Sequence, residues 1–413
     1  MTPTLVDIRD LDHADPLARF RDQFVRHDDP VAYLDGNSLG RPPKATIERM
    51  CEVLDVEWGE RLIRGWEDQW MDLPGRVGDR LAAAVLGAAP GQTVIADSTS
   101  VNLFKVLHAA CSLRPNRTEI VIDDTNFPTD RYLVESVAAS RGLEIRWITP
   151  EPITSVTGDL LATVIGPRTA VVVLSHVDYR SATILDLAGL TAQIHDAGAV
   201  AVWDVCHSVG ALPIDLDAAG ADFAVGCTYK YLNAGPGAPA FLYVAARHIE
   251  AVQQPITGWW SAADLFAMAG DYRAAPTINK MLSGTPNILG ITAVDEGIAI
   301  IADAGIGAIR DKAIALTELA VDLTDSWLPG MALASPRDSA LRGAHISLQC
   351  TDAGAITEAL IARQVIPDFR HPDMIRLGLS PLTTSYEEVW TAMTALREIT
   401  EGESGQRTST IEP

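Results

Sequence analysis

The sequence predicts an α/β protein with a large, mostly parallel sheet and a smaller C-terminal α+β domain. Over most of the chain, short apolar runs alternate with longer amphipathic stretches, a pattern typical of βαβ units. Beyond a long helical stretch that begins near residue 291, single strands and helices follow one another, which indicates a second, smaller domain. The 413 residues are 47% hydrophobic, so the chain can bury a sizeable core.

The strands expected in the large sheet are short apolar runs, and amphipathic stretches between them predict covering helices. The expected strands are Thr93–Ala96, Glu119–Ile122, Ala170–Ser175, Val200–Asp204, Phe223–Gly226 and Phe241–Val244. The expected helices are Val101–Ser112, Asp130–Arg141 and Leu187–Ala197.

The last third of the chain predicts a different order of elements. Two long helices come first, and then strands and helices alternate before a polar tail that begins at Gly402. These elements are Ile291–Ala304, Ile309–Leu328, His345–Gln349 (strand), Ala353–Arg363, Arg376–Leu379 (strand) and Tyr386–Glu398.

Charge and composition exclude several classes of partner. The 32 basic and 54 acidic side chains give a net charge of −22, which argues against nucleic acid and against anionic membranes. The five cysteines form no Cys-x-x-Cys pair and no zinc-ligand spacing, so we expect no disulfide framework and no metal. The N-terminus has no apolar run of a signal peptide, and no stretch is long enough to span a membrane. We therefore expect a cytoplasmic protein.

Two side chains stand at the ends of neighbouring predicted strands. Asp204 closes the run Val200–Asp204, and Lys230 follows Phe223–Gly226. Ligands in parallel α/β sheets bind at the carboxyl ends of the strands. Lys230 has apolar, aromatic and glycine neighbours, where a hydrated charge is costly unless it has a function. Of the other four lysines, we expect three to be solvated in polar or helical surroundings and one to lie in a helix: Lys44, Lys280, Lys312 and, in the helix, Lys105.

An aspartate and a lysine in these places suit pyridoxal phosphate. The lysine amine forms a Schiff base with the aldehyde of the cofactor, and the aspartate keeps the pyridine nitrogen protonated. Hydroxyl side chains at a helix N-terminus suit the phosphate, and Asp97-Ser98-Thr99-Ser100 precedes the helical stretch that starts at Val101. Alone, this cluster would indicate an ordinary helix cap.

Five motifs in the same order resemble the kynureninase family, pyridoxal-phosphate enzymes of fold type I in the aminotransferase class V group. The resemblance runs from about Asp12 to Glu398. The motifs are Tyr33-Leu34-Asp35-Gly36-Asn37-Ser38-Leu39-Gly40, Asp97-Ser98-Thr99-Ser100-Val101-Asn102, Phe127-Pro128-Thr129-Asp130, Trp203-Asp204-Val205-Cys206-His207-Ser208-Val209-Gly210 and Tyr229-Lys230-Tyr231-Leu232-Asn233-Ala234-Gly235.

The resemblance implies a seven-stranded sheet domain and a homodimer with shared active sites. It implies an N-terminal segment 1–45 that packs on the small domain, a large cofactor domain 46–290, a small domain 291–400 and a tail 401–413. Lys230 would be the Schiff-base lysine and Asp204 the pyridinium partner. Arg376 would hold the substrate α-carboxylate, with Asn37, Ser38 and Trp260 also on the substrate side. The remaining cofactor contacts would be Thr99, Ser100 and Tyr229 at the phosphate, Phe127, Asp130, Ser175 and His207 around the ring, and Trp259 and Thr285 from the neighbouring subunit.

The implied reaction is hydrolytic Cβ–Cγ cleavage of L-kynurenine or 3-hydroxykynurenine. Two departures leave the substrate open: Ser261-Ala262 stands where the family usually has Gly-His, and Tyr179-Arg180-Ser181-Ala182 where it has Tyr-x-Thr-Gly. Processing of a cysteine S-conjugate, as in lincosamide antibiotic biosynthesis, is the alternative. A second alternative is a non-catalytic protein of this fold. The presence of both Asp204 and Lys230 argues against it.

Overall fold

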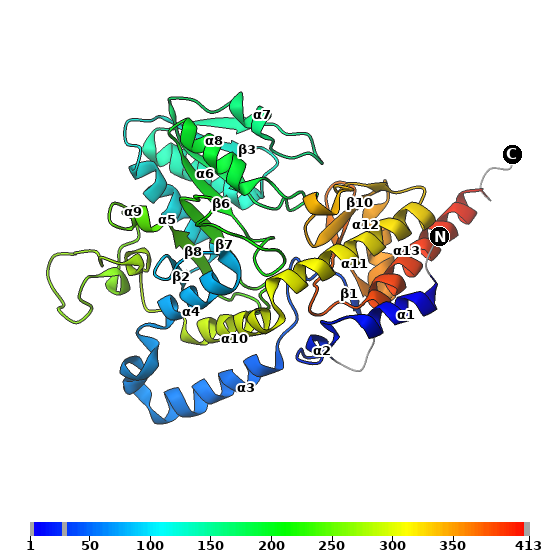
Figure 1. Ribbon diagram of the computed structural model, residues 1–413, viewed down its shortest axis with the longest axis horizontal. Coiled ribbons are helices and arrows are strands. Elements are labelled where there is room, and N and C mark those ends of the chain that lie inside the picture. The colour runs from blue at the N-terminus through cyan, green and yellow to red at the C-terminus, as the bar shows by residue number, and fades with distance from the viewer. Residues whose placement is uncertain (1–3, 27–30, 409–413) are drawn as a thin grey trace.

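The computed structural model describes residues 4–26 and 31–408, with side chains described up to residue 402. It has two lobes, and both ends of the described chain lie on the smaller one (Figure 1). The larger lobe is built on a seven-stranded sheet of order β2-β8-β7-β6-β5-β3-β4. Neighbouring strands are parallel except at β8, which is antiparallel to both β2 and β7. The α/β fold class with a large, mostly parallel sheet is therefore confirmed.

The strands of this sheet lie close to the predicted positions. Their bounds are β2 (Thr93–Ala96), β3 (Glu119–Asp123), β4 (Glu144–Ile148), β5 (Thr169–Ser175), β6 (Val200–Asp204), β7 (Phe223–Gly226) and β8 (Ala240–Val244). Only β4 was not predicted. It is an edge strand paired with β3, and its polar Glu144 and Arg146 interrupt the apolar run that marks a buried strand.

Alternate residues of the strands face two helical layers. In β5, Val171 and Val173 pack in one hydrophobic cluster with helices α5 and α6, whereas Val172 and Leu174 pack in the other with α4, α8 and α10. The two-residue period of a strand produces this division. The helices and short helical turns of the large lobe are α4 (Leu73–Leu81), η4 (Ala82–Leu86), α5 (Thr99–Ser112), α6 (Pro128–Arg141), α7 (Gly158–Ala162), α8 (Leu187–Asp196), α9 (Ala246–Ile249), η5 (Trp259–Ser261), η6 (Ile278–Met281) and α10 (Ile288–Ala304).

Helix α10 belongs to the core of the large lobe, although the sequence suggested a boundary at residue 290. Ile291, Val294 and Ile298 lie in the same cluster as the central strands. After Gly305, whose φ of 78° breaks the helix, α11 (Ile306–Trp327) runs across to the small lobe.

The small lobe has a four-stranded antiparallel sheet of order β12-β13-β10-β9 and a short parallel pair, β1 with β11. The parallel pair joins the N-terminal segment to this lobe, and Ile8 of α1 is buried in its core. Helix α13 continues past Gly402, where a tail was expected, and residues 409–413 of that tail lie outside the described ones. The elements are α1 (Leu5–Ala14), α2 (Ala18–Arg21), β1 (Ala32–Tyr33), β9 (Ala332–Leu333), η7 (Ser339–Leu341), β10 (His345–Gln349), α12 (Ala353–Ala362), β11 (Val365–Ile366), β12 (Asp368–Arg370), β13 (Met374–Gly378) and α13 (Tyr386–Thr408).

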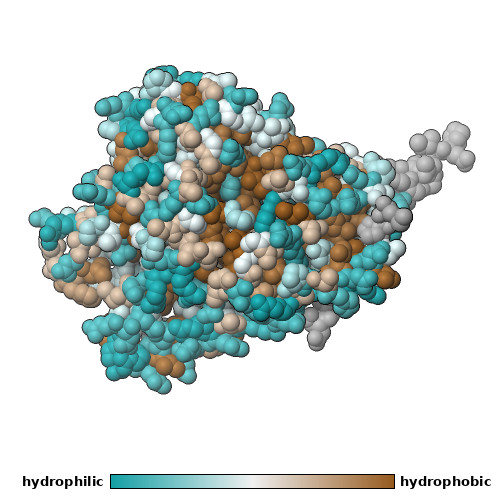
Figure 2. All heavy atoms as spheres, viewed as in Figure 1, coloured by the Kyte–Doolittle hydropathy of each residue, from teal (hydrophilic) through white to brown (hydrophobic). Residues whose placement is uncertain are grey.

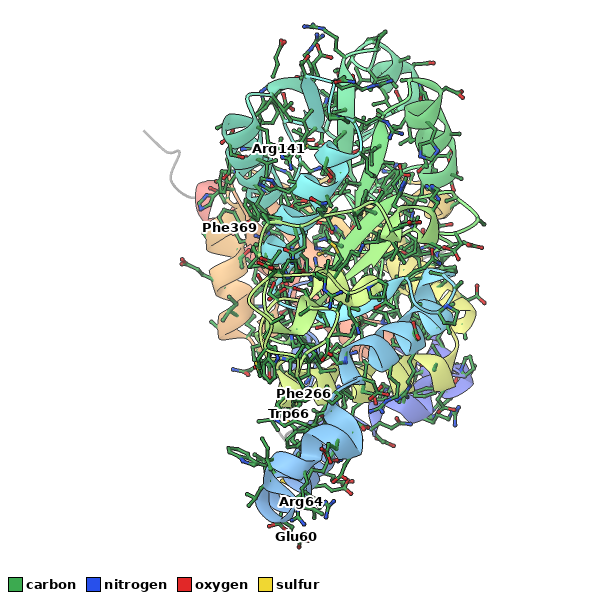
Figure 3. All side chains as sticks on the ribbon, turned by 90° about the vertical axis from the view of Figure 1, so that its left-hand side faces the viewer. Glu60, Arg64, Trp66, Arg141, Phe266 and Phe369 are labelled. Atoms are coloured by element: carbon green, nitrogen blue, oxygen red, sulfur yellow. The ribbon has the colours of Figure 1, made fainter. Side chains whose placement is uncertain are left out.

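A helical arm projects from the large lobe. It comprises α3 (Lys44–Glu52), the π-helical segments η1 (Val53–Glu60) and η3 (Trp66–Trp70), and the turn η2 (Leu62–Arg64) between them. Glu60 and Arg64 lie at its tip and Trp66 at its base (Figure 3). In Figure 2 the visible face of the arm is mainly hydrophilic, whereas hydrophobic residues gather between the two lobes. Within the described residues, no helix combines the length and the apolar character needed to cross a membrane.

Candidate functional site

Asp204 ends β6, and Lys230 lies in the loop that follows the adjacent strand β7. The two strands are parallel and Asp204 lies opposite Val225, so the loop that follows β7 begins beside Asp204. Both side chains are buried. Asp204 accepts a hydrogen bond from the backbone N–H of Cys206 at 2.6 Å through Oδ1. The carboxyl ends of β6 and β7 therefore carry a buried carboxylate and, in the following loop, a buried amine.

Lys230 differs from the other lysines in what its ammonium meets. The expectation that Lys280 and Lys312 are solvated is wrong, because both are buried, as is Lys105. Each of these three has an oxygen partner: Lys105 Nζ lies 2.5 Å from Asp97 Oδ2, Lys312 Nζ lies 2.6 Å from Asp15 Oδ2, and Lys280 Nζ donates to the carbonyl of Glu250 at 3.1 Å.

The ammonium of Lys230 instead meets an imidazole. Its Nζ lies 3.2 Å from Nε2 and 3.5 Å from Nδ1 of His207, and no ion pair of Lys230 is found among the described residues. A buried amine without an oxygen partner is costly unless another group occupies its surroundings. Among the described residues, this sets Lys230 apart from Lys105, Lys280 and Lys312.

Asp130 brings a second carboxyl group to Asp204. Its pKa is raised well above the ordinary value, first by burial and then by the charge of Asp204. Its Oδ2 has no hydrogen-bond partner among the described residues. Two adjacent buried carboxyl groups, in which Asp130 Oδ2 lacks a hydrogen-bond partner among the described residues, form a place for a cationic N–H.

His345 is a site residue that the sequence did not reveal. It comes from β10 of the small lobe, is fully buried, and its ring centroid lies 5.8 Å from that of His207. Burial lowers the pKa of both imidazoles, and Lys230 and Arg376 lower it further. Neither ring nitrogen of His345 has a hydrogen-bond partner among the described residues. No motif marks this residue, because β10 reaches the site only through the fold.

The N-terminus of α5 lies beside this group. Ser98 caps the helix by accepting from the N–H of Val101 at 3.3 Å. Thr99 and Ser100, the first helical residues, are half-buried, and Thr99 Oγ1 lies 4.0 Å from the thiol of Cys206. Helix N-termini with free N–H groups bind anions. Tyr229, beside Lys230 in the chain, has a pKa raised chiefly by burial.

Phe127 and Ser175 border the same space. The ring of Phe127 meets Tyr179 edge-on, with the centroids 5.3 Å apart. Ser175 ends β5 directly opposite Asp204 and donates to Asn126 Oδ1 at 3.0 Å. The side-chain amide of Asn126 also fixes the backbone of Phe127, because the N–H of Phe127 donates to Asn126 Oδ1 at 2.7 Å.

Arg376 of β13 contacts two of the expected substrate-side residues, Asn37 and Ser38. Its side chain is 1% exposed and forms an ion pair with Asp368. Its Nη1 donates to the carbonyl of Tyr179 at 2.5 Å, and its Nη2 donates to Ser38 Oγ at 3.2 Å. With its amide oxygen turned toward the guanidinium, Asn37 accepts from Nη2 at 3.3 Å. The loop that carries Asn37 and Ser38 therefore reaches the guanidinium directly.

This loop also touches the Lys230 loop. The N–H of Gly40 donates to the carbonyl of Tyr229 at 2.8 Å. A Cβ at Gly40 would lie 2.3 Å from the carbonyl oxygen of Lys230, so only glycine fits at this contact.

Three expected site residues do not join this group within one chain. Trp260 is buried against Trp66, with the ring centroids 5.0 Å apart. Trp259 is 41% exposed and Thr285 is exposed. The roles that the resemblance implies for Trp259 and Thr285 are those of residues from a second subunit.

The two departures from the family pattern have local structural consequences. Ala182 has a φ of 66°, a left-handed conformation that favours the glycine usual there. Ser261 closes a turn: its Oγ accepts from the N–H of Gly258 at 3.0 Å and from the hydroxyl of Tyr272 at 3.0 Å. Ser261 therefore has a structural role that the usual glycine cannot fill.

Known proteins resemble this chain along almost its whole length. The chain is 42% identical to the kynureninase of Pseudomonas fluorescens over 399 residues, 94% of each chain, and 42% identical to that of Burkholderia pseudomallei strain K96243 over 404 residues, 95% of each. The chain belongs to the kynureninase family. The model of the kynureninase C-terminal domain matches residues 309–396. This range begins within α11, ends within α13 and includes Arg376.

Solved structures agree with the fold of this kynureninase-family chain. A cysteine desulfurase of Thermococcus onnurineus NA1 superposes with a TM-score of 0.81 at 19% identity, covering 97% of this chain and 100% of its own. A C-DES variant with glycine covalently linked to its pyridoxal-phosphate cofactor gives 0.81 at 18% identity, with 92% and 99% covered. The chain is a pyridoxal-phosphate-dependent enzyme that acts on an amino acid, and its fold is that of the class V group.

The site residues fit this cofactor. The unpaired oxygen of Asp130 beside Asp204 suits a protonated pyridine nitrogen, and Lys230 provides a buried amine without a carboxylate partner. The hydroxyls of Thr99 and Ser100 at a helix N-terminus suit a phosphate.

Proposed function

We propose that this enzyme hydrolyses the Cβ–Cγ bond of L-kynurenine or 3-hydroxykynurenine, giving alanine and an anthranilate. The observation that carries the proposal is the buried group of Lys230, Asp204 and Arg376 in a chain of the kynureninase family. One water is consumed for each bond cleaved, and the reaction needs no oxidant or reductant.

Particular residues would hold the cofactor. Lys230 would bind its aldehyde, Asp204 its ring nitrogen with Asp130 alongside, and Thr99, Ser100 and Tyr229 its phosphate, while Phe127, Ser175 and His207 would border the ring. When bound, pyridoxal phosphate supplies an electron sink for the bonds at Cα of an amino acid.

The protein's own groups would orient the substrate and move its protons. Arg376, with Asn37 and Ser38, would hold the α-carboxylate, because a guanidinium matches a carboxylate in shape and charge. The amine of Lys230, once displaced by the substrate amine, would take the proton from Cα. His207 Nε2, 3.2 Å from Lys230 Nζ, would lie within hydrogen-bond reach of the amine during this transfer.

We also propose a homodimer with shared active sites, in which Trp259, Trp260 and Thr285 act at the neighbouring subunit. Large apolar side chains exposed on the arm support this: Trp58 is 57% and Ile63 76% exposed, beside a hollow of about 460 Å³. Sedimentation of the holoenzyme tests it, and a monomer would contradict it. None of the five cysteines forms a disulfide among the described residues, which supports a reducing, cytoplasmic location.

The decisive experiment offers the holoenzyme L-kynurenine, 3-hydroxykynurenine and S-methyl-L-cysteine, and measures anthranilate and pyruvate. We expect an anthranilate from the first two, and none from Lys230→Ala, which should also lose the visible absorption band of the bound cofactor. Pyruvate from the cysteine derivative alone would instead support S-conjugate processing, the second candidate, which Ser261-Ala262 favours.

A further inference from the structure

The guanidinium that would hold the substrate carboxylate already holds a carboxylate of this chain. Arg376 Nε donates to Asp368 Oδ2 at 2.7 Å, and its Nη2 contacts the same oxygen. The contacts to Tyr179 and Ser38 take two further N–H groups. Arg376 Nη2 also approaches Asn37 at 3.3 Å, so of the five N–H donors of an arginine only one, on Nη1, has no acceptor among the described residues. An incoming carboxylate cannot pair with Arg376 through two hydrogen bonds while all these contacts persist.

Asp368 is shared with a second arginine. The antiparallel register places Asp368 opposite Arg376, and Arg370 lies two residues further along β12, on the same face of the sheet. Arg370 Nε donates to the same Oδ2 of Asp368 at 2.8 Å. Exposure of the side chains increases outward, from 1% for Arg376 to 15% for Asp368 and 34% for Arg370. Asp368 therefore has a more accessible cation available on its outer side.

The second arginine balances the charges when a ligand carboxylate binds. A ligand carboxylate added to Arg376 and Asp368 alone would place two anions on one buried cation, and an uncompensated buried charge is costly. Arg370 supplies the second cation, so that each carboxylate can have one guanidinium.

We propose that Asp368 is an exchangeable stand-in for the substrate α-carboxylate: the ligand replaces it on Arg376, and Asp368 stays paired with Arg370. The proposal rests on the proposed function for the assignment of Arg376 to the α-carboxylate. It makes Asp368 and Arg370 determinants of specificity, because an amine without a carboxylate cannot displace Asp368 and leaves Arg376 occupied.

Binding of L-alanine to the holoenzyme, followed through the visible cofactor band, tests the exchange without turnover. Asp368→Asn removes the competing charge and should lower the Kd of L-alanine roughly tenfold, equivalent to about 1.4 kcal/mol. Arg370→Gln removes the receiving cation and should raise the Kd by a similar factor. In the Asp368→Asn background, Arg370→Gln should have little effect, since no displaced carboxylate remains to be received.

Two controls isolate the exchange. Arg363→Gln removes an exposed arginine of the same lobe that pairs with Glu398, and it should leave the Kd unchanged. Ethylamine, which lacks a carboxylate, should bind the wild type and Asp368→Asn equally. Circular dichroism establishes that each variant is folded.

Whether Asp368→Asn strengthens or weakens the binding of L-alanine decides whether Asp368 is exchanged. A weaker binding of L-alanine by this variant would show that Asp368 is a fixed support of Arg376 and would overturn the proposal. Additive effects in the double variant, or no L-alanine binding by the wild type, would also overturn it. Failure of kynurenine turnover, with the expected Kd pattern intact, would refute the proposed substrate and leave the exchange standing.

Discussion

Asp35 gives the enzyme a pH-dependent stability whose size follows from the structure. It begins the loop that carries Asn37 and Ser38, and pairs by a β-bridge with Gly378. Its pKa is raised from 3.8 to about 6, mainly because the carboxyl group is buried; the charge of Asp368 also raises it, while Ser38 and Arg376 oppose the shift. The carboxyl group is thus protonated more readily in the folded chain than in the unfolded one.

The magnitude and the sign follow from linkage. A change from 3.8 to about 6 corresponds to about 3 kcal/mol at about 1.4 kcal/mol per pH unit. Between these two values the folded state binds more protons than the unfolded state. The contribution of Asp35 to stability therefore falls as the pH rises through this window, and the loss is complete above a pH of about 6.

Asp35→Asn should abolish this dependence, because the amide keeps the shape and has no charge to bury. Relative to the wild type, its free energy of unfolding should rise by up to about 3 kcal/mol between pH of about 4 and about 7. Urea unfolding of both holoenzymes, followed by tryptophan fluorescence, measures the difference, in which the other titrating groups cancel. Asp271→Asn, at an exposed loop position, is the matched control and should show no such trend. A difference between wild type and Asp35→Asn that stays constant with pH, or is largest in acid, would refute the reasoning.

Three further predictions concern the site. Asp204→Asn should retain the visible cofactor band but lower kcat roughly 100-fold or more, the size typical of a lost electrostatic stabiliser; a kcat near that of the wild type would exclude the pyridinium role. Ala262→His, alone and with Ser261→Gly, should raise kcat/KM for kynurenine by ~5- to 150-fold if an imidazole hydrogen bond is restored; efficient wild-type turnover without any gain would show that other residues make this contact. Ala182→Gly should raise stability by up to about 1 kcal/mol, because the left-handed conformation of Ala182 costs more than the flexibility of glycine; thermal unfolding measures it, and a lower Tm would contradict the prediction.

The sequence predicted the sheet well because six of its strands are buried on both faces. Residues 200–203 and Phe223–Gly226 are apolar throughout and lack the alternation of a half-exposed strand. The edge strand Glu144–Ile148 carries polar side chains and resembles a loop in sequence. The sequence likewise could not predict that α10 packs on the large lobe, because the sequence of an apolar helix does not show which lobe it covers.

Local sequence did not correctly predict the surroundings of the other lysines. Lys280 and Lys312 were expected in solvent, yet the fold buries both and provides them with oxygen partners. Local composition could not distinguish them, because the partner Asp15 lies 297 residues from Lys312 in the chain. What sets Lys230 apart among the described residues is that its Nζ meets an imidazole and no oxygen partner, which is a property of tertiary structure.

The residues that the sequence did not reveal share one location, the face of the small-lobe sheet that meets the large lobe. His345 lies opposite Gly378 in the β10–β13 register, and Ser347 lies opposite Arg376, so these side chains point toward the same side. There Ser347 Oγ donates to the carbonyl of Arg180, and Arg376 donates to that of Tyr179. Since Lys230 belongs to the large lobe and Arg376 to the small one, these two hydrogen bonds help set the distance between the Lys230 amine and the Arg376 guanidinium, the two groups proposed to act on one substrate. A strand motif can indicate each group separately, but only the packing of the two lobes brings them to one site.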